Sequence, residues 1–238
     1  MDKQNRDNQT NPPTNLLLEE EAVSIRLNGS YLLTAMIAPD TKKEFITGYL
    51  FTEELISSLD DIESVRIEGC NVSVLTTNPF KMSKRRMVLS GCGSSSSFLD
   101  EKKLKPISSS YQIHASIIRE SACALPSALY SPSAALWNNE GCIFQCTDIG
   151  IHSACITCIG YGLIHGIEFE SCILATSGRV ATDIVRVALL CGIPVITSPT
   201  VPTKLAITIA ERMGLCVICG VTKDTMTIWT QKNAIISS

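Results

Sequence analysis

The residues best suited to chemistry lie in one short segment, Ser90-Gly91-Cys92-Gly93-Ser94-Ser95-Ser96-Ser97. Glycines on both sides of Cys92 allow backbone conformations that other residues rarely adopt, and the serines make the segment polar. Lys84, Arg85 and Arg86 lie just upstream, and cations near a thiol favour its nucleophilic thiolate. The segment predicts a reachable thiol that carries a group between two active sites. A flexible linker with an incidental cysteine is the alternative.

Two turns elsewhere have the composition of anion-binding sites. Ser177-Gly178-Arg179 follows the apolar run 172–176 and is expected to open a helix, and Pro202-Thr203-Lys204 follows the next apolar run. N–H groups at a helix N-terminus attract phosphate, and an Arg adds a bidentate ligand. Two such turns on successive strand–helix units predict a phosphate-bearing ligand held by Ser177, Gly178, Arg179 and Lys204. Helix capping alone is the alternative.

His152 is the histidine in a functional setting, whereas His114 and His165 are expected on helices as ordinary residues. It follows Asp148-Ile149-Gly150-Ile151, at a predicted strand-to-helix junction. Ligands of α/β sheets bind at such strand ends. We therefore expect His152 to contact the ligand, with a polar residue at a helix start as the alternative.

Two CxxC pairs, Cys155/Cys158 and Cys216/Cys219, together suggest a four-thiolate zinc site. The run 215–219 has the pattern of a strand, however, so residues three apart point to opposite faces. Neither pair has the Gly-containing turn expected of zinc ligands. These cysteines are predicted to be buried core thiols, and no metal site is expected.

Composition narrows the class of protein. The chain has 238 residues with 20 Lys+Arg and 23 Asp+Glu, a net charge of −3, which argues against a nucleic-acid binder. No apolar run reaches the roughly 18 residues of a membrane helix, and the polar N-terminus has no secretory signal pattern. We expect a cytoplasmic protein whose 11 cysteines are thiols. The low charged fraction of 18% indicates a large core, helped by a dimer interface.

The elements that position these residues fall into two halves. Residues 1–15 are expected to be a disordered tail, 16–88 a small α+β domain, 89–109 a Gly/Ser linker with Cys92, and 110–238 an α/β domain. Alternation and turn signals predict strands at 22–27, 31–37, 62–67 and 72–76, with helical spacing at 42–50 and 53–56. The second half predicts helices at 110–122, 151–164, 181–190 and 203–213, and strands at 134–137, 142–146, 172–176, 194–197, 215–221 and 225–230. Alternating strands and helices indicate a partly parallel sheet covered on both faces.

These motifs, in this order, resemble the FdhD family, the sulfur carrier proteins needed to make active formate dehydrogenase. The resemblance runs from about Leu18 to Trp229. It is carried by the following segments: Ile25-Arg26-Leu27-Asn28-Gly29, Phe45 to Ile56, Ser90-Gly91-Cys92-Gly93, Asp148-Ile149-Gly150-Ile151-His152-Ser153-Ala154, Ser177-Gly178-Arg179-Val180, Gly192-Ile193-Pro194-Val195 and Pro202-Thr203-Lys204-Leu205-Ala206.

The resemblance implies a fold and a function. The C-terminal domain would have the cytidine-deaminase-like three-layer α/β/α fold with a mixed sheet, but no H-x-E motif pairs with P-C-x-x-C, so a zinc deaminase is not expected. A cysteine desulfurase would pass persulfide sulfur to Cys92. That sulfur would then reach the molybdenum of a bis-molybdopterin guanine dinucleotide cofactor, bound as substrate, for formate dehydrogenase. The resemblance also implies a homodimer, and cofactor contacts at Gly220, Val221, Thr222, Lys223, Asp224 and Thr225.

Several positions depart from the family pattern. Ser95 replaces a second loop cysteine, which still permits a persulfide relay but argues against a thiol–disulfide oxidoreductase. Polar family residues are replaced at Thr147, Ile151, Ser153, Ile156, Thr157, Thr222 and Thr225. The alternative function is therefore a divergent molybdopterin-cofactor or guanine-nucleotide binding protein that no longer transfers sulfur.

Overall fold

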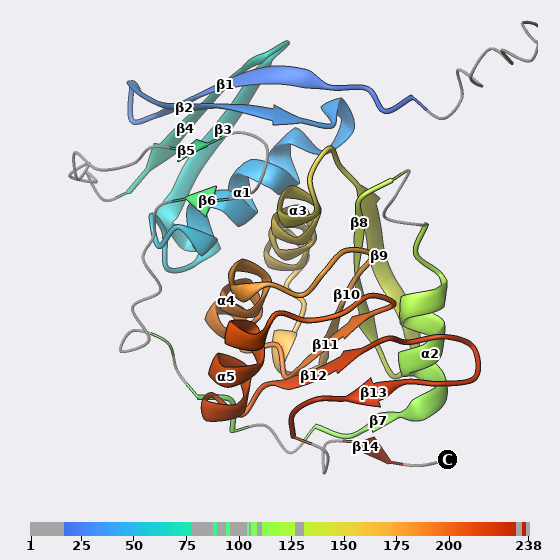
Figure 1. Cartoon of the computed structure of the whole chain (residues 1–238). Helices are drawn as coiled ribbons and strands as arrows, with labels where there is room; N and C mark the ends of the chain where they lie inside the picture. Colours follow the sequence, from blue (N-terminus) through green and yellow to red (C-terminus); the bar gives the residue numbers. More distant parts are fainter. Residues whose placement is uncertain are drawn as a thin grey trace, which may run out of the picture.

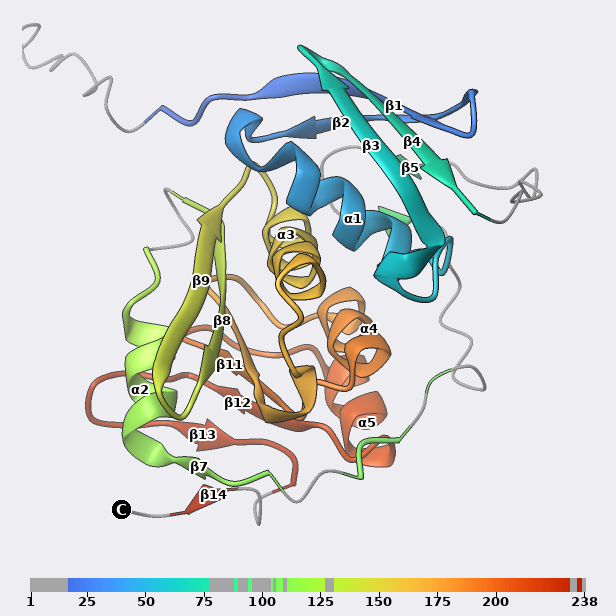
Figure 2. The ribbon, with the colours of Figure 1, turned by 180° about the vertical axis from the view of Figure 1, so that it is seen from behind.

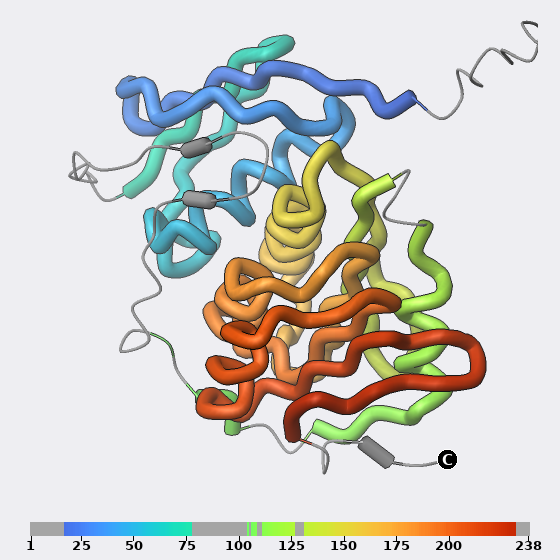
Figure 3. Tube along the Cα trace, in the orientation of Figure 1, coloured from blue at the N-terminus to red at the C-terminus, as the bar shows by residue number. Residues whose placement is uncertain are grey.

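The computed structural model describes residues 17–77, 88–89, 94–95, 104, 106–108, 111–126, 131–231 and 235–236. In this part of the chain, two mixed sheets and five α-helices form the body of the molecule (Figure 1). The blue and cyan start of the chain forms one sheet, and the yellow to red remainder forms the other (Figure 3). No helix among the described residues has the length and apolar character to cross a membrane.

The N-terminal sheet has four strands in the order β2-β1-β4-β3. Apolar and polar residues alternate, so one face buries Val23, Ile25, Val72 and Val74 while the other stays exposed. Asn28 and Gly29 join β1 to β2 with φ of 50° and 80°, the left-handed pair that a tight hairpin requires. Helix α1 covers the buried face (Figure 2). The bounds are β1 Glu21–Leu27, β2 Ser30–Ile37, α1 Lys42–Thr52, β3 Ile62–Glu68 and β4 Asn71–Thr76.

The second sheet has six strands in the order β13-β12-β11-β10-β8-β9, with β10, β11 and β12 parallel. Helices α3, α4 and α5 pack on one face and α2 on the other, each face with its own apolar core (Figures 1 and 2). The bounds are α2 Ala115–Cys123, β8 Ser133–Asn138, β9 Gly141–Thr147, α3 Ile151–Ile164, β10 Ile173–Thr176, α4 Thr182–Cys191, β11 Val195–Ser198, α5 Lys204–Arg212, β12 Cys216–Cys219 and β13 Thr227–Ile228.

Two short strand pairs complete the fold. Strands β5 (Val88–Leu89) and β6 (Ser94–Ser95) are antiparallel, and β7 (Ile113–His114) is parallel to β14 (Ile235–Ile236). Short 3-10 helices lie at Pro39–Thr41, Leu59–Asp61 and Phe169–Ser171.

Some predicted boundaries are wrong, each for a local reason. The helix expected over 110–122 begins only at Ala115, because Ile113 and His114 pair with β14. The helical spacing at 53–56 does not continue α1, since Glu54 adopts a left-handed φ of 56° just after the helix ends. Strands β12 and β13 are shorter than the predicted 215–221 and 225–230, and His114 lies on a strand rather than a helix.

Helices α1 and α3 join the two halves at a very close crossing. A Cβ at Gly48 or Gly160 would run into the backbone of the facing helix, at Ile156 and Glu44 respectively. Arg186 of α4 adds a polar contact between the two halves, because its guanidinium donates to the carbonyl of Thr52 at 2.6 Å. The first sheet is therefore fixed to the helical layer that covers the second.

Candidate functional site

Three loops meet where the parallel strands β10, β11 and β12 end. Ser198, the last residue of β11 and fully buried, holds them together. Its Oγ donates to the carbonyl of Gly178 at 2.8 Å and accepts from the N–H of Thr200 at 3.0 Å. Its carbonyl accepts from the N–H of Val221 at 3.1 Å. These hydrogen bonds join the loops at the strand-end edge, which is where α/β sheets usually bind ligands. We call this edge, formed by Gly178, Ser198, Thr200 and Val221, the platform.

The first predicted anion turn, Ser177-Gly178-Arg179, begins at a buried serine that a hydrogen bond holds in place. Ser177 is 1% exposed, and its Oγ accepts from the N–H of Ser133 at 2.9 Å. Gly178 packs against Ile151 so closely that a Cβ would lie 2.8 Å from its Cγ1. The expectation that this turn opens the helix directly is wrong, because α4 begins only at Thr182. Arg179 is exposed and free to meet a ligand.

The second predicted turn adjoins the first. Val180 and Pro202 form a parallel bridge, and the N–H of Thr203 donates to the carbonyl of Val180 at 3.0 Å. The Thr203 Oγ1 caps α5 by accepting from the N–H of Ala206. Lys204 lies near a helix start, as predicted; it is the first residue of α5, one residue later than the predicted start at Thr203, and is exposed. Within the described residues neither Arg179 nor Lys204 forms an ion pair with a carboxylate.

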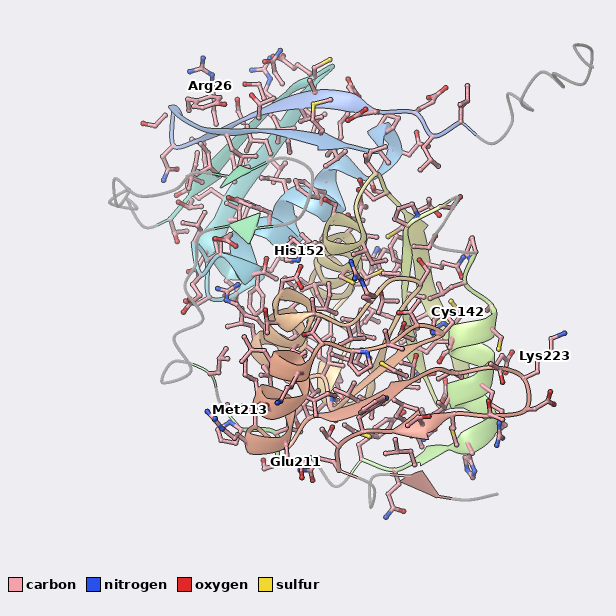
Figure 4. The ribbon with its side chains drawn as sticks, viewed as in Figure 1. Arg26, Cys142, His152, Glu211, Met213 and Lys223 are labelled. Carbon is pink, nitrogen blue, oxygen red and sulfur yellow. The ribbon has the colours of Figure 1, made fainter. Side chains whose placement is uncertain are left out.

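The stretch Gly220–Thr225 leaves the same edge but turns outward. The N–H of Gly220 donates to the carbonyl of Thr200 at 2.6 Å, and Thr222 closes a turn with Thr225. Val221 is buried, whereas Thr222, Lys223, Asp224 and Thr225 are exposed. Lys223 points into solvent at the outer end of this loop, well away from His152 (Figure 4). Only the start of the stretch joins the platform.

His152 and Asp183 bring two helix starts together. Each is the second residue of its helix, α3 and α4, and the imidazole Nδ1 lies 3.3 Å from the Asp183 Oδ2. Nδ1 makes no well-aligned hydrogen bond to a described residue, so the two groups are close neighbours without a strong hydrogen bond. Burial works to raise the pKa of Asp183, but the neighbouring imidazole outweighs it and the pKa is lowered. The strand-to-helix position predicted for His152 is confirmed, but its partner was missed.

Asp148 is a further residue that the sequence reasoning left out. It is 1% exposed, and its Oδ1 accepts the N–H groups of Ile149 at 2.6 Å and Ala38 at 3.3 Å. Its Oδ2 has no hydrogen-bond partner among the described residues. Burial raises its pKa to about 6, against partial compensation from backbone N–H groups. The sequence signal that could have identified Asp148 is its position as an acidic residue directly after a predicted strand.

Cys92 lies outside the described residues, whereas the structure places the other cysteines. Cys216 and Cys219 belong to the cores on opposite faces of the sheet, so they cannot converge on one metal ion. Cys155 and Cys158 are fully buried on α3, as predicted. No group of three or more His, Cys, Asp or Glu side chains in the described ranges is arranged to hold a metal.

Burial makes most of the placed thiols poor nucleophiles. It raises the pKa of Cys172 to about 11 and those of Cys216 and Cys219 to about 12. The pKa values of Cys155, Cys158, Cys191 and Cys142 are raised for the same reason. The exposed Cys70 also has a raised pKa, chiefly because it donates to the carboxylate of Glu21. A cysteine with a raised pKa is almost entirely in the protonated thiol form at neutral pH, and this form is a poor nucleophile.

The fold defines an α/β protein in which the loops after three parallel strands are joined by hydrogen bonds. The chain belongs to the FdhD/NarQ family, whose model matches residues 18–236. A sulfur carrier protein FdhD from Thermoplasma acidophilum is 29% identical over 244 residues, covering 91% of this chain and 86% of that protein. One from Bacillus pumilus is 26% identical over 249 residues, covering 98% and 95%.

A solved structure has the same fold. It is a crystal structure of a candidate formate dehydrogenase accessory protein from Desulfotalea psychrophila. The two structures superpose with a TM-score of 0.76 at 22% identity, over 91% of this chain and 90% of that one. The mixed α/β architecture predicted from the sequence is confirmed by this likeness.

Proposed function

We propose that this protein is a sulfur carrier that matures formate dehydrogenase. The observation that carries the proposal is the family match over residues 18–236, together with the relatives named sulfur carrier protein. In this proposal the protein is a sulfurtransferase and not a deaminase. It receives persulfide sulfur from a cysteine desulfurase and gives it to a molybdenum cofactor.

Cys92 is the residue proposed to carry the sulfur. Its thiolate attacks the terminal sulfur of the desulfurase persulfide, one S–S bond forms as another breaks, and the desulfurase leaves as a thiolate. The exchange is redox-neutral and needs no further reagent. Glycines around Cys92 and cations upstream favour a reachable thiolate. The raised pKa values of the buried cysteines support the choice by making those thiols unsuitable.

The platform is proposed to hold the cofactor during delivery. The substrate would be the bis-molybdopterin guanine dinucleotide molybdenum cofactor, whose phosphates need cations and N–H groups. Arg179 and Lys204 are exposed on two turns that are bridged to each other, and His152 lies on the neighbouring helix start. Gly220 leads the outward loop from the same edge. This arrangement fits an elongated anionic ligand.

Several finer features belong to the same proposal. The six-stranded sheet with helices on both faces fits a cytidine-deaminase-like three-layer fold. Domain limits at 16–88 and 110–238, a homodimer, and a cytoplasmic location with formate dehydrogenase as partner are proposed with it. Sedimentation velocity tests the dimer directly.

Binding of GDP, a fragment of the proposed cofactor, tests the platform. We expect Arg179→Ala and Lys204→Ala each to raise the calorimetric Kd roughly 10-fold, the loss of one charge-assisted contact. Arg26→Ala is the matched control, because Arg26 is exposed on the N-terminal sheet, far from the platform (Figure 4). Equal affinities in all four proteins would contradict the phosphate site. GDP binding without any sulfur on Cys92 would favour the binding-only alternative.

A further inference from the structure

The carboxylate of Asp183 is held in a defined orientation. Its Oδ1 accepts the N–H of Ile184 at 2.9 Å, in the first turn of α4. This contact leaves Oδ2 to reach across to α3, where it lies 3.3 Å from the Nδ1 of His152. A carboxylate fixed on one oxygen and paired on the other is a typical means of orienting an imidazole.

The pair is partly shielded from water. The side chain of His152 is 14% exposed and that of Asp183 is 34% exposed. Ile151, the residue before His152, packs against Gly178 of the first anion turn. The imidazole therefore sits on a helix start whose first residue packs against the platform.

No other described carboxylate takes this role. Asp148, in the same strand-to-helix segment, directs its Oδ1 to the N–H groups of Ala38 and Ile149, and its Oδ2 has no described partner. His152 makes its only described ion pair with Asp183. Losing Asp183 would free the ring to rotate.

We infer that Asp183 is a positioning residue of the ligand site, which holds the Nδ1 side of His152 and so fixes the orientation in which the ring meets a ligand phosphate. The inference rests on the proposed function for the identity of the ligand. It deepens that function by assigning a residue outside the two anion turns, one that touches the imidazole rather than the ligand. It also explains why an acidic side chain lies at an anion-binding edge.

Nuclear magnetic resonance of the imidazole nitrogens tests this inference, with GDP as the probe. The chain has three histidines, so His152→Gln assigns the signals of His152 by their loss. We expect GDP to shift the His152 Nε2 signal and leave those of His114 and His165 in place. Asp183→Ala should change the His152 nitrogen pattern without ligand and raise the GDP Kd roughly 10-fold, the size of a charge-assisted contact. Asp183→Glu should restore most of both.

Controls separate positioning from folding and from the proposed function. Asp60→Ala removes an exposed acid on the N-terminal half and should leave the His152 signals and the GDP Kd unchanged. Unchanged His152 signals and unchanged Kd in Asp183→Ala would overturn the inference while leaving the sulfur carrier role intact. Wild-type affinity in His152→Gln would also overturn it. If the wild type fails to bind GDP, the ligand assignment and the inference both fall, whereas sulfur loading of Cys92 is measured separately.

Discussion

Removing one hydroxyl should loosen the whole ligand platform. In Ser198→Ala the carbonyl of Gly178 and the N–H of Thr200 lose hydrogen bonds of 2.8 and 3.0 Å. Each lost bond of this kind costs about 1 kcal/mol, and more where the group is kept from water. We therefore expect the free energy of unfolding to fall by about 2 kcal/mol. With a urea slope of about 2–3 kcal/mol/M, the midpoint should drop by roughly 0.7–1 M.

Urea unfolding and hydrogen exchange measure this effect together. The amide of Thr200 should gain more in exchange rate in Ser198→Ala than the amides of the N-terminal sheet, which follow only the change in global stability. Ser171→Ala is the control, because it removes one exposed hydroxyl contact with Glu168 and should shift the midpoint very little. An unchanged midpoint with unchanged exchange at Thr200 would refute the role given to Ser198.

Three further predictions concern the joint between the two halves. Gly160→Ala should destabilise the protein by about 1–3 kcal/mol, because its Cβ meets facing backbone; Gly150→Ala, with ordinary contacts only, should be tolerated in the same thermal melts. Arg186→Lys should cost about 1–2 kcal/mol in urea, since the bond to Thr52 is lost, and an unchanged midpoint would argue against this contact. Asp148 has a pKa of about 6 in the folded protein, against an ordinary 3.8. Its protonated form therefore stabilises the fold below pH 4, and this stabilisation is lost as the pH rises through 6. Asp148→Asn should flatten the pH dependence of the melting temperature between pH 4 and 7.

Local patterns predicted most elements because local chemistry decides them. Alternation in 22–27 and the Asn28-Gly29 turn specify a hairpin with one buried face, and the structure has that hairpin. The apolar run 151–164 forms a helix buried against both the sheet and α1. Gly192 ends α4 with a left-handed φ of 76°, as its position after the apolar run indicates.

Contacts between distant residues could not be predicted in this way. Ile113 and His114 have helical neighbours, yet they pair with β14 near the other end of the chain. The approach of Gly160 to α1 depends on two helices whose relative position no local pattern contains. Boundaries therefore failed where tertiary pairing overrode local preference.

In the candidate site, too, local sequence predicted some features, and only the fold revealed others. Its turns were visible because Gly, Arg and Lys follow predicted strands, and the structure joins those turns through Val180 and Pro202. Ser198 and Asp183 were not visible, since an isolated Ser or Asp becomes meaningful only beside its partner in space. The outward path of Lys223 likewise follows from the turn that Thr222 forms with Thr225.

The most direct test of the sulfur carrier proposal is the intact mass of the protein after incubation with a cysteine desulfurase and cysteine. Wild type, Cys92→Ala and Cys123→Ser are compared, since Cys123 is an exposed thiol outside the proposed relay. The proposal predicts one added sulfur on wild type and Cys123→Ser, and none on Cys92→Ala. Equal addition to all three proteins, or no addition to any, would contradict Cys92 as the carrier.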